Sequence, residues 1–324
     1  MIWESLRRNP LGMFGLALLG AIVLMAVFAP QLAPYDPTKL TGKPFEAPSS
    51  AHWLGTNDIG QDIFSELIHG ARVSLVIGVL AAAIAMLIGT VVGLVAGYYR
   101  GPLGAGLMRV VDVVLVIPFL PLMVLLAAYL GQSIWNLIIV IGLLIWARPA
   151  RVIRSQVLSL SERDYVLASR VIGAKDSRIL TRAILPGVLS LALAQFVLAA
   201  SGTILLEASL SFLGLGDPTQ KSWGTILFYA QARNAFLSGA WLWWVVPTGL
   251  MITLTVVGFA LLGFAMEEAL NPRLKASRAV RGASQPAPKK PSPNHTSDTV
   301  QLESAPHSAR TNSVAGRVDK LGAE

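Results

Sequence analysis

The chain has 324 residues, of which 54% are hydrophobic and only 14% are charged, whereas soluble domains usually carry about a quarter charged residues. The apolar residues stand in long uncharged runs, so the composition excludes an ordinary soluble domain and predicts an integral membrane protein. The absence of cysteine excludes disulfides and thiolate metal sites, and the four scattered histidines make a metal centre unexpected. The net charge of +8 fits loop charges that set membrane topology better than nucleic-acid binding.

Six membrane-spanning helices are predicted, after a short N-terminal segment at residues 1–10. The first apolar run carries no charge and is long enough to cross about 30 Å of hydrocarbon. It lacks the small-residue cleavage site of a signal peptide, so we interpret it as a retained helix. The six spans are placed at 11–30, 73–99, 109–130, 133–149, 183–206 and 241–266.

Glycine, proline and tryptophan mark special positions in these spans. Gly89, Gly93 and Gly97 recur at every fourth residue, which predicts a smooth face that another helix approaches closely; chance spacing is the alternative. Pro118 and Pro121 predict a kink in the third span. The sixth span begins with Trp241, Trp243 and Trp244, whose rings are suited to the membrane interface.

The segments between the spans differ in character. Residues 31–72 and 207–233 are predicted as loops, and the Gly-Gln-Ser sequence at 131–133 separates the third span from the fourth. The tail at 276–324 is rich in Ser, Pro, Ala and Lys, so we expect it to be disordered and cytoplasmic. The longest charged connection, the loop at 150–182, joins the fourth and fifth spans.

The 150–182 loop contains a short amphipathic pattern. Tyr165, Ala168 and Ile172 fall at i, i+3 and i+7, with Val171 beside them, which predicts a short helix with one apolar face. A loop that only joined two membrane helices would not need such a face. The pattern therefore predicts an element that docks onto another protein.

Start and stop signals frame this helix. Ser161 followed by Asp164 is similar to a capping box with Asp in place of Glu, and predicts the start of the helix. Gly173 allows the chain to turn. Asp176 is suited to cap a second short helix, and Pro186 restricts the residue before it. The stretch is therefore predicted as helix, turn, helix.

Basic residues predict which side of the membrane each loop faces. Six spans put both termini on the same side. That side carries twelve Lys and Arg residues before the tail, eight of them between Arg148 and Arg182, whereas the opposite side carries five. The positive-inside rule therefore places both termini and the 150–182 loop in the cytoplasm.

Within residues 165–186, four positions follow a spaced pattern: Ala168, Gly173, Leu185 and Pro186. With this spacing the stretch resembles the cytoplasmic EAA loop of ATP-binding-cassette importer permeases, approximately E-A-A-x-x-x-G, nine residues, I-x-L-P. Three positions depart from the family pattern, in which Glu, Ala and Ile stand at the places of Leu167, Ser169 and Ala183. The apolar face and the glycine turn are retained, whereas a polar contact of the family's Glu is not available to leucine.

Three further stretches narrow the resemblance: 52–62 with 70–75, 207–216 with 223–224, and 271–274. They are similar to segments of dipeptide and oligopeptide permeases of the C type, namely H-x-L-G-T-D-x-x-G-R-D, E-x-x-L-S-F-L-G-L-G…W-G and D-P-R-L. Asn57 and Gln61 depart from the first segment and remove one negative and one positive charge. The similarity covers residues 1–275 and leaves out the tail.

The resemblance implies an all-α integral membrane protein with the type I ABC importer permease fold, six transmembrane helices and a cytoplasmic coupling helix. The permease domain at 11–275 would form one transmembrane subunit of an ATP-driven importer of di- and oligopeptides in the bacterial cytoplasmic membrane. Implied partners are a homologous second permease, two cytoplasmic ATPase subunits and an extracytoplasmic solute-binding protein. The chain has no G-x-x-x-x-G-K-[ST] phosphate loop, so ATP would be bound by partners, and no cofactor or enzymatic activity is expected in the chain itself.

Three groups of residues are candidates for these contacts. The ATPase-coupling group is Tyr165, Ala168, Arg170, Val171, Ile172, Gly173, Leu185 and Pro186. The pore or gating group is Asp112, Pro118, Pro121 and Glu207. The group facing the binding protein is Asp58, Asp62 and Trp223. The alternative for the coupling group is a helix face packed on its own bundle. For Asp112 and Glu207 it is helix capping or a salt bridge, and for the group facing the binding protein it is stabilisation of the loops.

Other functions remain open at this point. Permeases with these motifs also carry nickel or other small solutes. A stand-alone secondary transporter would be expected to show coupling carboxylates in the middle of the membrane and inverted repeats, and neither is found in the sequence. A membrane enzyme would need paired catalytic groups within the spans, which are also not found. Copurification of ATPase subunits would distinguish an importer subunit from the other two.

Overall fold

The computed structural model describes residues 6–7 and 9–270, and these residues form helices and connecting loops without a β-sheet. The predicted disordered tail and the stretch at 271–274 lie outside the described residues. The segments η1 and η2 are π-helical. The elements are α2 (Pro10–Val27), α3 (Ala29–Leu32), α4 (Ile63–Tyr98), α5 (Pro102–Val116), α6 (Phe119–Leu130), α7 (Ile134–Ile145), α8 (Ala147–Ser161), α9 (Asp164–Val171), α10 (Asp176–Arg178), η1 (Ile179–Ile184), α11 (Leu185–Leu210), η2 (Ser211–Leu215), α12 (Trp223–Ala232) and α13 (Trp241–Leu270).

Four helical stretches of the described chain are long and apolar enough to cross a membrane: α2, α4, the run from α10 to η2, and α13. Two helix pairs reach the same criterion together, α5 with α6 and α7 with α8, but they are bent by 84° and 43°. The chain therefore has four to six candidate spans. The count is four if the bent pairs are left out and six if each bent pair forms one span.

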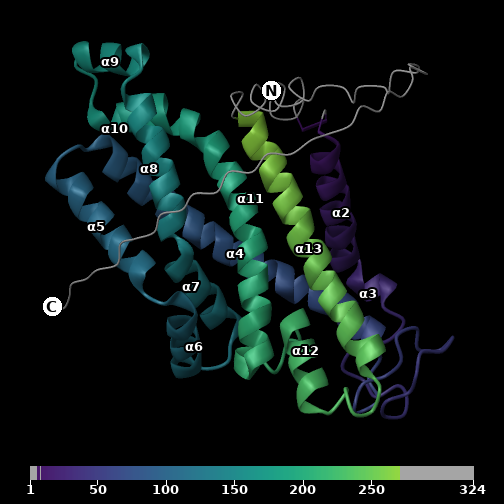
Figure 1. Ribbon diagram of the computed structural model, residues 1–324. Coiled ribbons are helices and arrows are strands. Elements are labelled where there is room, and N and C mark those ends of the chain that lie inside the picture. Colours follow the sequence, from purple (N-terminus) through teal and green to yellow (C-terminus); the bar gives the residue numbers. More distant parts are fainter. Residues whose placement is uncertain (1–5, 8, 271–324) are drawn as a thin grey trace, which may run out of the picture. The chain divides into compact units, whose positions relative to one another are not determined.

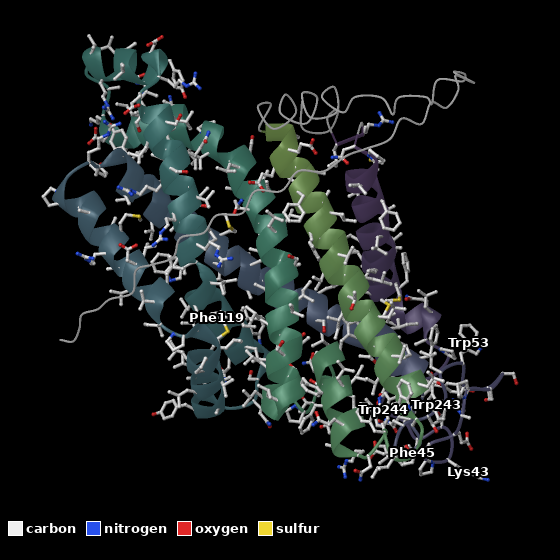
Figure 2. All side chains as sticks on the ribbon, in the orientation of Figure 1. Lys43, Phe45, Trp53, Phe119, Trp243 and Trp244 are labelled. Carbon is white, nitrogen blue, oxygen red and sulfur yellow. The ribbon has the colours of Figure 1, made fainter. Side chains whose placement is uncertain are left out.

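The ends of the helices gather at two opposite ends of the described part of the chain (Figure 1). The start of α2 and the end of α13 lie at the same end as α9, and the Asn9 amide there donates to Glu268 at 3.1 Å. At the other end lie α3, α12 and the loop at 33–62. Figure 2 shows Phe45, Trp53 and Trp243 gathered around that loop.

The 36-residue helix α4 is the element on which the others pack, and it contacts α2, α7, α8, α11 and α12. Its glycines lie against α8, as their spacing predicted. A Cβ at Gly93 would lie 2.7 Å from the Ala150 carbonyl oxygen and 2.7 Å from the Ile153 Cβ. At Gly89 and Gly97 it would lie 2.9 Å and 2.7 Å from the nearest side-chain atoms of α8. Because these glycines have no side chains, the backbones of α4 and α8 approach each other closely. Close approach at small residues is a common way in which helices pack in membranes.

Replacing Gly93 with Leu is expected to destabilise the fold by about 1–3 kcal/mol, because the new side chain would meet the backbone of α8 as well as its side chains. Thermal unfolding in detergent would measure the change. Gly202→Leu in α11 is the matched control, since nothing lies within 4 Å of a Cβ built there. Equal unfolding temperatures for the two variants would contradict the close contact.

The proline and glycine breaks appear where the sequence predicted them. Pro118 is the N-cap residue of α6 and stands at the 84° bend between α5 and α6. Gly131 has a φ of +84°, a conformation that suits glycine, and the chain turns there before α7 begins at Ile134. The predicted break at Pro118 and the division at 131–133 are confirmed, whereas Pro121 lies inside α6 and marks no break.

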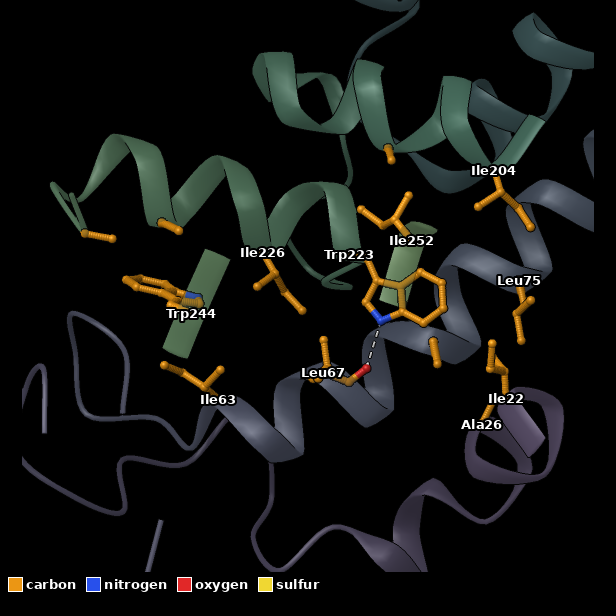
Figure 3. Packing of buried hydrophobic residues seen from close by; sticks show 14 of the residues in the cluster. Ile22, Ala26, Ile63, Leu67, Leu75, Ile204, Trp223, Ile226, Trp244 and Ile252 are labelled. Carbon is orange, nitrogen blue, oxygen red and sulfur yellow. Dashed lines mark hydrogen bonds between the residues drawn. The ribbon is translucent and has the colours of Figure 1, made fainter. Parts of the chain in front are cut away.

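A buried cluster at the end opposite α9 joins α2, α4, α11, α12 and α13 (Figure 3). Trp223 and Trp244 are fully buried in it, and the Trp223 indole N–H donates to the Leu67 carbonyl at 2.9 Å. The interface prediction is therefore wrong for Trp244, whose ring lies 6.4 Å from that of Phe45 inside the fold. Trp241 is exposed and remains suited to a membrane surface.

Three predicted boundaries are wrong. The second helix begins at Ile63 and not at residue 73, because Asp62 caps it by accepting from the Ser65 N–H at 2.8 Å. Helix α8 continues through most of the first half of the predicted 150–182 loop and buries its own apolar stripe. The predicted 207–233 loop contains α12, which Ser222 caps by accepting from the Thr225 N–H at 3.2 Å.

Candidate functional site

Helix α9 is a separate short helix between α8 and α10, as the amphipathic pattern predicted. Its predicted cap is wrong: the Ser161 hydroxyl donates to the Val157 carbonyl at 2.7 Å, because Ser161 is the last residue of α8. After α9 the chain turns at Gly173, whose φ is +77° and whose N–H donates to the Arg170 carbonyl at 3.0 Å. The glycine turn is confirmed, since this backbone conformation disfavours other residues.

Val166 is the buried side chain that packs α9 against the rest of the fold. Val166 is fully buried and belongs to a cluster with Val157 of α8 and with Ile179 and Ile184 of η1. Val188 extends this cluster into α11. The packing of buried apolar side chains is dense and resists compression, so a displacement of α9 would be passed to α8 and α11.

The remaining apolar residues of α9 point away from the bundle. Val171 and Ile172 are 86% and 82% exposed, and Tyr165, Leu167 and Ala168 are exposed as well. The alternative in which this face packs on its own bundle does not hold for these residues. A short exposed helix with a clustered apolar face is a surface on which another protein can dock.

Arg170 and Asp176 both contact the Tyr98 side chain at the end of α4, and the cap predicted at Asp176 is wrong. The Arg170 guanidinium lies 5.0 Å from the centre of the Tyr98 ring, and the Tyr98 hydroxyl donates to an Asp176 carboxylate oxygen at 2.7 Å. Lys175, and not Asp176, is the N-cap residue of α10. These contacts fix the turn after α9 against α4, while Arg170 stays exposed.

Leu185 and Pro186, the last two residues of the coupling group, open α11. Leu185 is half-buried and Pro186 is exposed. The helix is continuous from η1 into α11, so Pro186 removes a backbone donor from inside it, which accords with the irregular turns that precede it. The six residues before them form the π-helical segment η1, so the two residues lie where the irregular helix becomes regular.

The pore candidates lie in different surroundings. Asp112 is half-buried on α5, and Arg151 of α8 donates to its carboxylate at 2.6 Å. Glu207 is fully buried, and its carboxylate accepts from Ser74 at 3.1 Å and from Ser211 at 2.8 Å. Glu207 therefore joins α4, α11 and η2 and lies away from any surface of the chain, so the geometry favours a structural role.

The two prolines of the third span are also separated. Pro118 stands at the bend, whereas Pro121 lines an open apolar groove of about 770 Å³ between α6 and the end of α11. Phe212 and Leu213 of η2 line the same groove. The Gln132 amide donates to the Gly214 carbonyl at 2.5 Å and thereby joins the α6–α7 turn to η2.

Two of the three residues expected to face a binding protein are buried. Asp62 is almost fully buried, where it caps α4 and lies 2.9 Å from the His52 Nδ1, and Trp223 is in the core. The contact prediction is wrong for both, and loop stabilisation, the alternative, describes them. Asp58 is paired with Arg233 at 3.4 Å and links the loop at 33–62 to the end of α12.

Comparison with known proteins decides the family. Residues 89–276 match the family described as binding-protein-dependent transport system inner membrane component. Residues 1–48 match the N-terminal TM domain of oligopeptide transport permease C. The chain belongs to the binding-protein-dependent transport permeases. It is thus a multi-pass inner membrane protein, and its family implies a separate ATPase subunit and a binding protein as partners.

The sequence similarity to individual relatives extends over most of this permease. It is 36% identical over 275 residues to the dipeptide transport system permease protein DppC of Bacillus subtilis, covering 84% of this chain and 85% of the relative. It is 38% identical over 272 residues to the oligopeptide transport system permease protein OppC of the same organism, covering 83% and 88%. The glutathione transport system permease protein GsiD of Pectobacterium atrosepticum is 36% identical over 258 residues, covering 79% and 84%.

The permease also contains a partly buried ionic cluster that the sequence did not predict. The Lys221 ammonium contacts a carboxylate oxygen of Glu66 and lies 2.7 Å from the Gln61 amide oxygen. The Asn57 amide donates to the same Glu66 oxygen at 2.9 Å. Asn57 and Gln61 are the two residues that depart from the family motif, so the departures lie around one ion pair, whose acid is buried and whose lysine is half-buried.

The loop after η2 is fixed by a second acid. The Asp217 carboxylate accepts from the Thr219 hydroxyl at 2.6 Å and from the Ile134 N–H, at the start of α7, at 3.4 Å. Partial burial of Asp217 disfavours its charge, but these hydrogen bonds outweigh the burial and lower its pKa below the ordinary value.

Within residues 6–7 and 9–270, no group of three or more His, Asp or Glu side chains could hold a metal ion.

Proposed function

We propose that this permease is one of two homologous transmembrane subunits of an ATP-driven importer of di- and oligopeptides. The observation that carries the proposal is α9, which is anchored by Val166 and presents an exposed apolar face with Val171 and Ile172. We assign this face to the cleft of a cytoplasmic ATPase subunit, and two such ATPase subunits bind all of the ATP. The apolar side chains would be removed from water when the ATPase docks.

The proposed orientation places α9 and both termini in the cytoplasm, with each bent helix pair counted as one of six spans. Twelve basic residues on the α9 side against five on the other support this orientation. The loop at 33–62 then faces the extracytoplasmic solute-binding protein. In this loop Leu40, Trp53 and Ile59 are exposed, and they replace Asp62 and Trp223 as candidate contacts.

The proposed mechanism is mechanical. ATP-driven closure of the ATPase subunits displaces α9, and the buried contacts of Val166 pass the displacement to α8 and to η1. The run from η1 through α11 to η2 is continuous, so its far end, beside the groove at Pro121, moves with it. Rigid-body movement of this kind would open the pathway to one side of the membrane at a time.

Peptides are proposed as cargo because the relatives are named for dipeptide, oligopeptide and glutathione transport. Uptake of a labelled dipeptide by proteoliposomes with the complete transporter tests this. We expect uptake that requires ATP and the ATPase subunits and that excess unlabelled peptide abolishes. Uptake by the permeases alone would overturn the importer assignment, and ATP-dependent uptake of nickel but not of peptide would overturn the cargo.

A further inference from the structure

An apolar groove of about 440 Å³ lies between α2, α4 and α13, and one arginine, Arg72, stands in its wall. The floor is formed by Ala26, Leu75 and Phe259, which are buried or half-buried in the cluster around Trp223. The floor therefore belongs to the core of the chain, and the groove is a surface built into the fold.

The arginine and the apolar wall follow one face of α4. Arg72, Val76 and Leu80 are spaced by four residues and line the groove together. At a rise of about 1.5 Å per residue, Leu80 lies about 12 Å along the helix from Arg72. Across the groove Val27 is the last residue of α2. Arg72 therefore lies beside the end of α2, although it is the tenth residue of α4. Because α4 has 36 residues and about 20 suffice to cross the hydrocarbon core, we place Arg72 at the interface, and the apolar wall runs from it toward the interior of the membrane.

The charge of Arg72 is not neutralised by the described part of the chain. Arg72 is exposed, and no residue among 6–7 and 9–270 forms a hydrogen bond or an ion pair with it. A guanidinium beside apolar side chains in a membrane span is energetically costly unless it reaches the interface and finds an anion there. Guanidinium groups match phosphate oxygens because they can donate two parallel hydrogen bonds.

We propose that this groove binds an anionic phospholipid. Its phosphate accepts hydrogen bonds from Arg72, and one acyl chain lies along Val76 and Leu80 over the buried floor. A single cation at the interfacial end of an otherwise apolar groove fits an amphiphile with one anionic head and a hydrocarbon tail. Occupation of the groove would neutralise Arg72 and hold α2 against α4.

The test uses the complete transporter in lipid nanodiscs of equimolar phosphatidylglycerol and phosphatidylcholine. The photoreactive residue p-benzoylphenylalanine replaces Val23, which is exposed on the α2 wall of the groove, so the α4 face stays intact. Illumination should give an adduct with phosphatidylglycerol in preference to phosphatidylcholine. Arg72→Ala should lower the phosphatidylglycerol adduct by about fivefold, and Arg72→Lys should retain part of it.

Lys39→Ala is the matched control, because Lys39 is an exposed cation in the loop at the same end and outside the groove. It removes the same charge and should leave the adduct unchanged. Equal labelling of both lipids, or labelling that is insensitive to Arg72→Ala, would overturn the proposal. So would a photo-adduct with the second permease or another protein chain, since the groove would then be a subunit interface.

Discussion

Val171→Asp is expected to release the ATPase subunits from the transporter. Val171 is 86% exposed on α9, so the substitution leaves the fold intact and places a charge on the face that we assign to the ATPase cleft. Burying an unpaired carboxylate in a protein interface costs more than 1.4 kcal/mol, so the fraction of permease that retains ATPase should fall by about tenfold or more. Copurification from detergent measures this fraction, and ATP-dependent uptake should fall with it.

Leu237→Asp is the matched control for this experiment. Leu237 is also 86% exposed, but it lies between α12 and α13, at the end opposite α9. It introduces the same charge at an equally exposed apolar position. ATPase retention should be unchanged in this variant. Loss of ATPase in both variants would indicate a general effect of the added charge, and retention in both would refute docking through α9.

Local features were predicted well because they depend on nearby residues. The apolar periodicity of α9, the bend at Pro118 and the glycine face on α4 each follow from backbone chemistry that a short stretch of sequence contains. The start of α4 was missed because its first turns carry Glu66 and other polar residues, which end a hydropathy run without ending a helix. The cap at Asp62 determines that start.

The roles of polar residues at the ends of spans were less predictable. An acid beside an apolar run looks the same in sequence whether it lines a pathway or is buried. Burial of Glu207 is tolerated because Ser74, which is distant in the chain, donates to it, and Trp223 is buried because α12 folds back onto α4. Tertiary pairing of this kind has no local signature, so only the structure distinguishes partner contacts from internal ones.

Lys221→Met is expected to destabilise the permease strongly. The substitution removes the cation that contacts Glu66, whose side chain is 1% exposed, and leaves only the Asn57 amide on that carboxylate oxygen. Breaking one side of a buried ion pair typically costs about 3–5 kcal/mol because a buried charge stays uncompensated. The unfolding temperature in detergent, measured at one fixed heating rate because membrane proteins often unfold irreversibly, should fall clearly.

Two further variants separate the ion pair from a general effect of losing a lysine. Lys39→Met removes an exposed lysine that lies 3.8 Å from Asp36, and such surface pairs contribute about 0–1 kcal/mol, so its unfolding temperature should be close to that of the unmodified protein. Glu66→Gln combined with Lys221→Met removes both charges and should recover most of the lost stability, since no buried charge is left unpaired. A double variant as unstable as Lys221→Met would show that the lysine acts through its packing on Tyr229, whose ring centre lies 5.4 Å from the ammonium, and not through the charge of Glu66.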